Sequence, residues 1–214
     1  MGLTATLCER IAGLRHGDIG PEALAAGRRL VLDGLGVAVA GVSEEDAVPI
    51  LARTLRALGG APVSTAIACG FRIDPVRAAA INGAAMHVLD FEPMWSPATH
   101  ALSVTLPVAL ALAEARSLPG REVLAALIKG IEIQGWLREA SGQYTPDVLQ
   151  FHPPGLVGPM GAVAVAGHLL GLDPARLANA FGIAGSRAGT LFGNVGTMTK
   201  SAHCGQAAAM GLEA

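Results

Sequence analysis

Titratable side chains gather in three short segments that separate long apolar stretches of this chain. The first segment, MHVLDFEPMWSPATH at residues 86–100, holds two imidazoles, two carboxylates and a tryptophan. A packed apolar core does not need such groups, so we expect this segment to carry chemistry. Pro93 and Pro97 fix φ and lack an amide donor, which predicts that the preceding helix stops near Asp90 and that an ordered loop follows.

The two other polar segments are residues 150–154 and residues 197–203. All three segments lie at predicted helix ends, and loops at the same end of packed helices converge on one space. Binding and catalytic groups are commonly placed on such loops, above a rigid scaffold. The side chains that we expect to face a common cavity are Asp90, His100, His152 and Lys200.

Two imidazoles and one ammonium together form a receptor for a small polyanion. Imidazoles titrate near neutral pH, so one of them can transfer a proton while the other neutralises a carboxylate. Other interpretations stay open, because His152 can brace a turn and Lys200 can be an ordinary solvated lysine. His87 and His168 lie inside apolar helices and are interpreted as core or interface histidines.

Familiar cofactor patterns are missing from the sequence. No two candidate residues have HExxH or another metal-ligand spacing, so we expect no metal site. The glycines around Gly193 and Gly196 form neither a GxGxxG nor a Walker pattern, which argues against a nucleotide site. A net charge of -2 and the lack of a lysine-rich run argue against nucleic-acid binding. We therefore expect no cofactor and no nucleic-acid partner.

The elements that must position these groups are helices. Alternating strands and helices are not evident, and residues 63–69 are expected to be a short extended piece outside any sheet. The sequence predicts an all-α fold, a compact multi-helix domain packed through alanine- and glycine-rich helices. The last helix has no glycine or proline stop, so the chain is expected to continue. The predicted helices are residues 4–14, 21–39, 43–58, 75–89, 102–116, 121–140, 155–170, 174–184 and 201 onward.

The composition indicates what surrounds this domain: a protein partner or further domain, a reducing compartment and no membrane. The 214 residues are 51% hydrophobic and only 15% charged, so we expect apolar surface to be buried against a partner subunit or a further domain. The three cysteines are far apart and form no CxxC pair, which is typical of a reducing cytoplasm. Residues 148–172 lack Asp, Glu, Lys and Arg, but His152, three prolines and five glycines favour a buried helix over a membrane span.

Six blocks of this sequence, in order, resemble the MmgE/PrpD family, which contains 2-methylcitrate dehydratase and cis-aconitate decarboxylase. The resemblance covers nearly the whole chain. The blocks are LVLDGLGVAVAG (30–41), AAAINGAAMHVLDFE (78–92), SPATH (96–100), GREVLAALIKGIE (120–132), FHPPGLVGPMGAVAVAGHLLGLD (151–173) and TKSAHCGQAAAMG (199–211).

The resemblance implies a helical domain over residues 1–214 of a homodimeric lyase or isomerase that acts on a small di- or tricarboxylate without a metal. It also implies a second, α/β domain that lies outside this chain and supplies a further lysine and tyrosine. In the positions that match the family, Asp90 and His100 are expected to be catalytic, with Asp90 orienting His100. His152 and Lys200 are expected to bind substrate carboxylates.

Three residues depart from the family's usual DDT pattern, since this chain reads Glu92, Pro93 and Met94 there. The leading expectation is a cytoplasmic lyase that dehydrates a 2-methylcitrate-like acid or decarboxylates a cis-aconitate-like acid. One alternative is a non-catalytic fragment or pseudo-enzyme that keeps the helical dimerisation surface. Another is an isomerase or epimerase of an amino-dicarboxylate, which would use the same proton-transfer groups.

Overall fold

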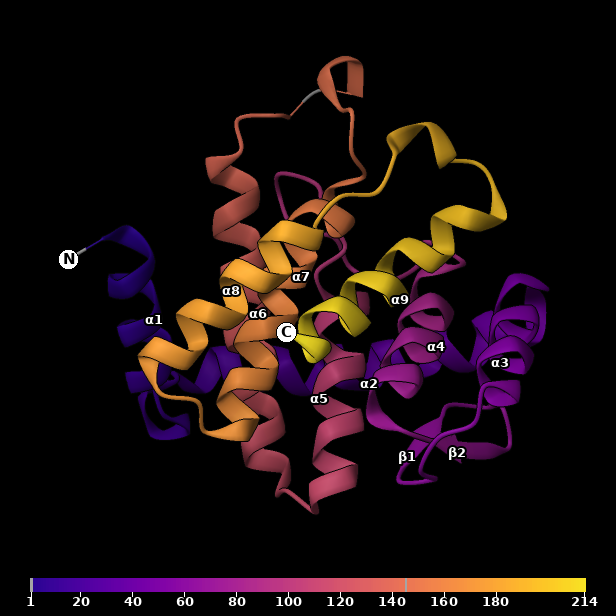
Figure 1. Ribbon diagram of the computed structural model, residues 1–214, viewed down its shortest axis with the longest axis horizontal. Helices are drawn as coiled ribbons and strands as arrows, with labels where there is room; N and C mark the ends of the chain where they lie inside the picture. The colour runs from indigo at the N-terminus through magenta and orange to yellow at the C-terminus, as the bar shows by residue number, and fades with distance from the viewer. Residues whose placement is uncertain (1, 145) are drawn as a thin grey trace.

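Four apolar helices form the centre of the structure: α4 (Pro75–His87), α5 (Leu102–Arg116), α7 (Pro153–Leu170) and α9 (Met198–Glu213). In the computed structural model, which describes residues 2–144 and 146–214, α4 and α7 each pack against both α5 and α9 (Figure 1). Most residues of α4, α5 and α7 are buried. The central helices thus bury one another on several sides, which is the arrangement that the mostly apolar sequences of α4, α5 and α7 favour.

The remaining helices surround this centre. Within the described residues the structure has nine α-helices and one two-stranded sheet, so the prediction of an all-α fold is confirmed. Helix α6 packs on α7, α2 packs on α4 and α6, and α8 packs on both α1 and α7. The outer elements are α1 (Leu3–Gly13), η1 (His16–Asp18), α2 (Pro21–Glu44), α3 (Ala47–Ala57), α6 (Gly120–Ala140), η2 (Pro146–Val148), α8 (Pro174–Arg187) and η3 (Phe192–Asn194).

Two helices begin with an aspartate followed by a proline, as their sequences predict. The Asp74 carboxylate accepts a hydrogen bond from the amide of Arg77 at 3.1 Å. The Asp173 carboxylate accepts one from the amide of Arg176 at 2.8 Å. Each cap satisfies an amide that the first turn of a helix leaves free, and the following proline has no amide to satisfy.

Glycines let α4 approach its neighbours closely. A Cβ atom at Gly205 of α9 would lie 2.1 Å from the carbonyl oxygen of Ala80 in α4, and one at Gly83 would lie 2.8 Å from the carbonyl oxygen of Ser103 in α5. Both obstacles are backbone atoms, which cannot move aside independently. Helix α4 is therefore packed very closely by its neighbours, as expected of a domain packed through alanine- and glycine-rich helices.

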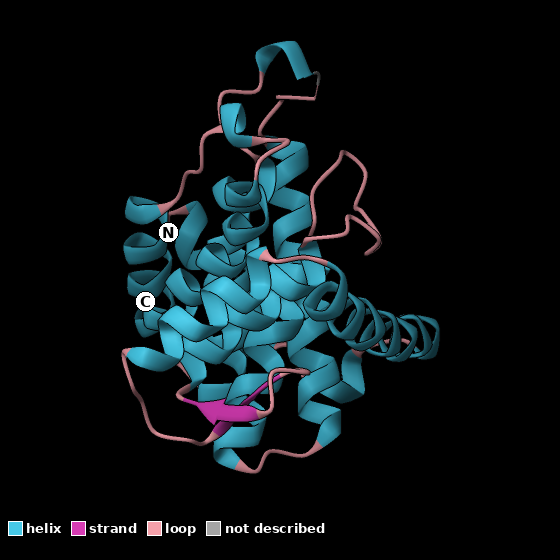
Figure 2. Ribbon diagram, turned by 90° about the vertical axis from the view of Figure 1, so that its right-hand side faces the viewer, coloured by secondary structure: helices cyan, strands magenta, loops and turns pink. Residues whose placement is uncertain are grey.

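The expectation for residues 63–69 is wrong. Strand β1 (Ser64–Ala66) pairs antiparallel with β2 (Phe71–Ile73) in a small hairpin (Figure 2). Ala68 and Gly70 in the connection have φ values of 56° and 74°. The turn lacks the Asn-Gly or Asp-Gly pair by which such hairpins are usually recognised, so the sequence offered little sign of it.

Helix α2 runs past Gly41, where the sequence predicts its end. Gly41 is instead a packing position, because a Cβ atom there would lie 2.2 Å from the carbonyl oxygen of Ala85. Ser43 lies inside the same helix and donates its hydroxyl to the carbonyl of Val39. Helix α3 consequently begins at Ala47, four residues later than predicted.

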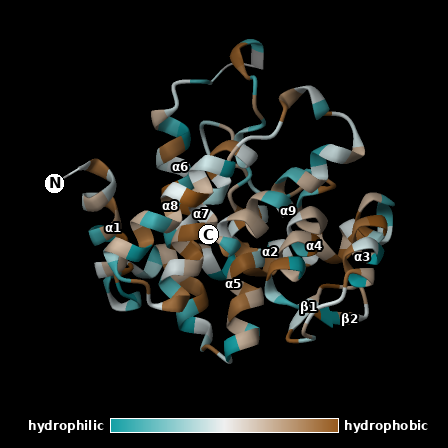
Figure 3. Cartoon of the chain, in the orientation of Figure 1, coloured by the Kyte–Doolittle hydropathy of each residue, from teal (hydrophilic) through white to brown (hydrophobic). Residues whose placement is uncertain are grey.

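Helix α7 is the helix within the described residues that is long and apolar enough to cross a membrane. Most of it is buried against α5, α6 and α9, which agrees with the predicted buried helix. Figure 3 shows hydrophobic residues along the central helices and on parts of the periphery. Among the peripheral ones, Leu32 and Val39 of α2 are 74% and 49% exposed, so this helix presents apolar side chains to the outside.

Candidate functional site

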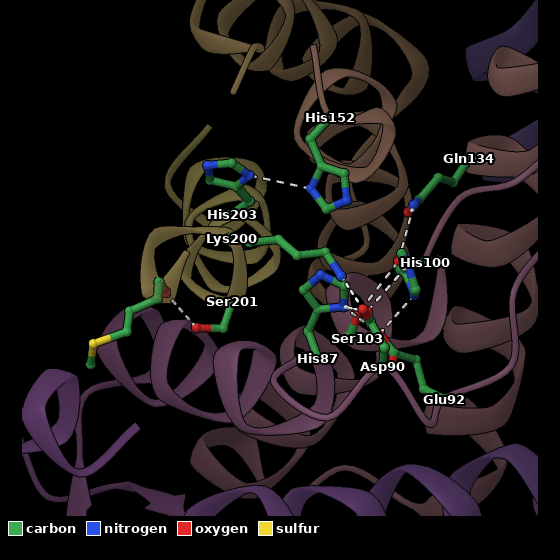
Figure 4. Close-up of polar contacts among 11 residues, drawn as sticks. His87, Asp90, Glu92, His100, Ser103, Gln134, His152, Lys200, Ser201 and His203 are labelled. Carbon is green, nitrogen blue, oxygen red and sulfur yellow. Dashed lines mark hydrogen bonds and ion pairs between the residues drawn. The ribbon is translucent and has the colours of Figure 1, made fainter. Parts of the chain in front are cut away.

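Four imidazoles meet where the ends of the central helices converge (Figure 4). His87 ends α4, His100 precedes α5, His152 is the N-cap of α7, and His203 lies in α9. The ring centroids are 4.3 Å apart for His87 and His100, 5.5 Å for His87 and His152, and 5.3 Å for His152 and His203. All four residues are buried. Distant parts of the sequence therefore build one polar cluster inside an apolar body, which we call the histidine cluster.

An ion pair between Asp90 and Lys200 lies beside the histidine cluster. Asp90 has a φ of 54°, a left-handed conformation that aspartate tolerates better than most residues. Its Oδ1 atom lies 3.5 Å from His87 Nδ1 and 3.6 Å from His100 Nε2. Lys200, predicted on a loop, lies in the first turn of α9, which Thr197 caps. The carboxylate of Asp90 thus stands between the ammonium and two imidazoles.

Glu92 is a second carboxylate of the site, and only 3% of it is exposed. Its Oε1 atom accepts a hydrogen bond from His87 Nδ1 at 2.7 Å. The same oxygen lies 3.0 Å from His100 Nδ1, although that contact lacks hydrogen-bond geometry. Burial raises the pKa of Glu92, but the facing imidazoles of His100 and His87 outweigh burial and lower the pKa to about 2. The carboxylate is therefore ionised at neutral pH.

The other imidazoles are held in an environment that disfavours their charge. Burial lowers the pKa of His87, and Glu92 only partly opposes that shift. Burial, followed by the neighbouring imidazoles and the Lys200 ammonium, lowers the pKa of His152 to about 3. Burial also lowers the pKa of His203. An anionic ligand would shift these pKa values upward, because a nearby negative charge stabilises an imidazolium.

Helix α6 fixes the loop of residues 88–101 that carries His100. Gln134 donates a hydrogen bond to the carbonyl of His100 at 3.3 Å, and Arg138 donates one to the carbonyl of Ala98 at 2.8 Å. Residues four apart lie on the same face of a helix, so both side chains reach the loop together. Both are almost fully buried. The loop is therefore held by an element outside the cluster itself.

His152 is fixed through its backbone and through its ring. Its amide donates to the carbonyl of Thr190 at 2.7 Å. Its Nδ1 atom lies 3.2 Å from His203 Nδ1. One nitrogen must donate and the other must accept, so the two neutral rings have opposite tautomers. The pair therefore fixes which nitrogen of each ring remains available for a ligand.

A cavity of about 470 Å³ lies next to the ion pair, and His87, Asp90 and Lys200 contribute to its wall. A larger cavity of about 670 Å³ lies between α1 and α6, but its wall is mostly apolar and contains none of the clustered histidines. Binding of a small anion requires the titratable groups. The smaller cavity is therefore the candidate site, although His100 and His152 are not among the residues that line it.

Three imidazoles of the cluster also form a possible metal-ligand set. Ligand nitrogens of His87, His100 and His152 lie within 4.8 Å of one another, as do ligand atoms of a second set in which Asp90 and Glu92 join the first two histidines. The spacing along the sequence does not reveal these sets. In the second set the carboxylates already face imidazoles and a lysine of the chain, and the Lys200 ammonium beside Asp90 opposes an added cation.

The structure brings the four predicted side chains together. His100 and His152 have ring centroids 6.1 Å apart, and Asp90 contacts both His100 and Lys200. Sequence reasoning missed three participants, His87, Glu92 and His203, and interpreted His87 as a core histidine. A weak signal existed for two of them, since His87 precedes Asp90 by a single helical turn and Glu92 follows it by two residues.

Comparisons with known proteins find a matching family and several related enzymes. The MmgE/PrpD N-terminal domain matches residues 5–214. Human cis-aconitate decarboxylase is 36% identical over 218 residues, which cover 99% of this chain and 45% of the human protein. The mouse cis-aconitate decarboxylase is 34% identical over 223 residues and 44% of its length. Cis-aconitate decarboxylase of Aspergillus terreus is 30% identical over 221 residues. The chain thus spans less than half the length of these relatives.

Proposed function

Because the chain belongs to the MmgE/PrpD family, as its N-terminal domain, we propose that it is the helical part of a lyase that acts on a small di- or tricarboxylate. The observation that carries the proposal is the convergence of a partly exposed ion pair, Lys200 and Asp90, with four buried imidazoles on one site. Such a site offers charge for carboxylates and proton carriers for the reaction. A second, α/β domain outside these residues is part of the proposal.

Substrate carboxylates are bound by Lys200 and His152. An incoming carboxylate competes with Asp90 for the Lys200 ammonium, and a charge-assisted hydrogen bond of this kind is among the strong ones. His152 is neutral before binding and takes up a proton when the anion arrives. No resident metal is required, because the ammonium and the imidazolium supply the positive charge.

His100 transfers the proton at the carbon skeleton. In a decarboxylation, the C–C bond to the leaving carboxylate breaks, CO₂ departs, and the electron pair remains on carbon, conjugated with the C=C bond of a cis-aconitate-like acid. An imidazolium at His100 then donates its proton to carbon, so a C–H bond forms and the imidazole becomes neutral. The names of the relatives favour this reaction over dehydration for the present chain.

Two observations favour a second candidate, a non-catalytic carboxylate-binding protein. Pro93 and Met94 replace polar residues of the related pattern, and Met94 is 60% exposed. A chain with this change can retain the histidine cluster and bind the acid without turning it over. An isomerase or epimerase of an amino-dicarboxylate uses the same groups and differs in the bond that is broken, which is C–H instead of C–C.

The assembly and the compartment are also proposals. We propose a homodimer, which is supported by the exposed Leu32 and Val39 on α2. We propose a cytoplasmic location, which is supported by three free cysteines, two of them buried. Burial raises the pKa of the Cys204 thiol well above its ordinary value, so this residue is suited to packing and not to reactivity.

The direct test is turnover of cis-aconitate by the purified protein with its α/β domain included, measured as released CO₂ and as the product seen by proton NMR. The parent protein should release CO₂. His100→Ala should lower kcat by about 100-fold or more, because it removes the proton donor. Lys200→Met should raise KM by about tenfold or more, because it removes a charged hydrogen bond to the substrate.

The matched control is His16→Ala, since His16 lies in η1 outside the cluster. It should leave both constants unchanged. Calorimetric binding of cis-aconitate without CO₂ release would support the non-catalytic candidate. An unchanged rate for a folded His100→Ala variant would remove the assigned role of His100.

A further inference from the structure

Glu92 holds a position that the reaction outlined above does not use. Within the described residues its carboxylate has no lysine or arginine partner, and it faces only the imidazoles of His87 and His100. Its Oε2 atom is buried without any hydrogen bond. Burying a carboxylate away from a permanent cation costs free energy. Its presence in the cluster therefore calls for a role.

The protonation state of Glu92 constrains both neighbours. An ionised carboxylate can only accept hydrogen bonds, so a nitrogen that bonds to it must carry a hydrogen atom. Nδ1 of His87 makes this bond at 2.7 Å. Nδ1 of His100 lies 3.0 Å from the same oxygen without hydrogen-bond geometry, and it is the nitrogen of that ring that can bond to Glu92. Nε2 is therefore the nitrogen of His100 that remains free to exchange a proton. It points toward Asp90, whose Oδ1 atom lies 3.6 Å away.

Asp90 is poorly placed to orient His100 itself. The 3.6 Å separation is too long for a strong hydrogen bond. The other carboxylate oxygen of Asp90 is engaged by the Lys200 ammonium. In addition, Asp90 faces Nε2, the very atom that must be free to reach a substrate. The expectation that Asp90 orients His100 does not fit this geometry.

We infer that Glu92 is the positioning residue for His100, and that it fixes the Nδ1–H tautomer and directs Nε2 toward the substrate. This inference rests on the proposed function, in which His100 transfers the proton. The contact of Glu92 with His100 tightens into a hydrogen bond when the substrate binds, since apo contacts at catalytic groups are often poorly aligned. Asp90 then pairs with Lys200 until the entering substrate carboxylate competes for that ammonium.

The carboxylate of Glu92 also stabilises the positive charge that His100 carries before it donates its proton. An aspartate plays this part for the histidine of a serine protease. Other charged or titratable groups face the same space and contribute to any pH dependence. They are Asp90 on the loop, His87 at the end of α4, His152 at the start of α7, and Lys200 and His203 on α9.

The test is Glu92→Gln, which keeps the size of the side chain and removes its charge. Nitrogen-15 NMR of the histidine rings reports the tautomer of His100, with the signal assigned by its loss in His100→Ala. Wherever the ring is neutral, the parent should show the Nδ1–H tautomer. In Glu92→Gln the preference for Nδ1–H should weaken, because an amide can donate as well as accept a hydrogen bond. Glu9→Gln, an exposed change of the same kind on α1, should not alter it.

An unchanged tautomer in a folded Glu92→Gln variant would overturn the inference. If that variant does not fold, Glu92→Asp keeps the charge but withdraws it by one methylene, and it should weaken the preference of His100 for Nδ1–H by less. An unchanged preference in that variant would overturn the inference too.

Kinetics supply an independent readout. Glu92→Gln should lower kcat by between about 10- and 10⁴-fold with little change in KM. Loss of positioning therefore changes kcat alone, whereas a general structural defect would impair substrate binding as well and raise KM. The NMR result does not need turnover. A protein without any turnover would therefore refute the proposed function and leave the assignment of Glu92 testable.

Discussion

His152 and His203 illustrate how a single contact between two residues sets the chemistry of the site. Their Nδ1 atoms lie 3.2 Å apart, and burial lowers the pKa of both rings. The pair is stable when one nitrogen carries a hydrogen and the other does not. His203 therefore decides which nitrogen of His152 can donate to a substrate carboxylate. His203 itself is one ring further from His100, the histidine that transfers the proton.

His203→Asn tests this role. The variant should weaken binding of cis-aconitate by about tenfold or more, because His152 loses the partner that fixes its tautomer. Isothermal titration calorimetry at pH 7 measures the dissociation constant directly. His16→Asn makes the same change outside the cluster and should bind like the parent. Equal affinity of the parent and a folded His203→Asn variant would show that His203 only packs.

At the scale of elements, the site depends on how closely the helices approach one another. Helix α9 delivers Lys200 and His203 to the cluster, and α4 delivers His87. The two helices touch through Gly205, where a Cβ atom would lie 2.1 Å from a carbonyl oxygen of α4. A second glycine also leaves room for a close neighbour. At Gly135 of α6 a Cβ atom would lie 2.2 Å from the ring of Trp95, which belongs to the loop before His100.

Gly205→Ala should destabilise the protein by about 1–3 kcal/mol, as overpacking of a core usually does, because the obstructing atoms belong to the backbone. Urea unfolding followed by circular dichroism measures the change in the free energy of unfolding. Gly182→Ala is the matched control, since Gly182 lies in helix α8 with no atom within 4 Å of the added Cβ. That change should be neutral or stabilise the helix. Equal stability of Gly205→Ala and the parent would contradict the close packing of α4 and α9.

For the whole molecule, the burial of several histidines makes stability depend on pH. The ordinary pKa of His152 is 6.5, and in the fold it is lowered to about 3, mainly by burial. Below pH 6.5 the unfolded chain therefore binds a proton that the folded chain does not bind. Stability is full above pH 6.5 and is lost as the pH falls toward 3. His87 and His203 act in the same direction.

We expect the free energy of unfolding to fall between pH 7 and pH 5, with His152 contributing about 2 kcal/mol. Urea unfolding at several pH values measures this slope. His152→Asn removes one titrating group and should flatten the slope, even if it lowers stability at pH 7. A polycarboxylate should protect the folded protein most at the lower pH, because it stabilises the imidazolium. A slope that His152→Asn leaves unchanged would contradict the role of this group.

Local patterns in the sequence determined most of the helices and the candidate residues. The caps at Asp74 and Asp173 depend on side chains three residues from the amides they bind, so they could be read directly. The four predicted polar residues stood out because they interrupt long apolar runs. The small hairpin and the extension of α2 past Gly41 were missed, because the same glycine can end a helix or admit a neighbour.

Only the tertiary structure decided how the polar groups are paired. Glu92 meets both His87 and His100 because the loop folds back over the end of α4, and Lys200 meets Asp90 across 110 positions of sequence. A contact between distant segments depends on helix crossing angles and on the room that small residues leave, neither of which a local pattern contains. The sequence thus determined which groups are present and that they lie at helix ends, and the packing of the helices decided which nitrogen faces which carboxylate.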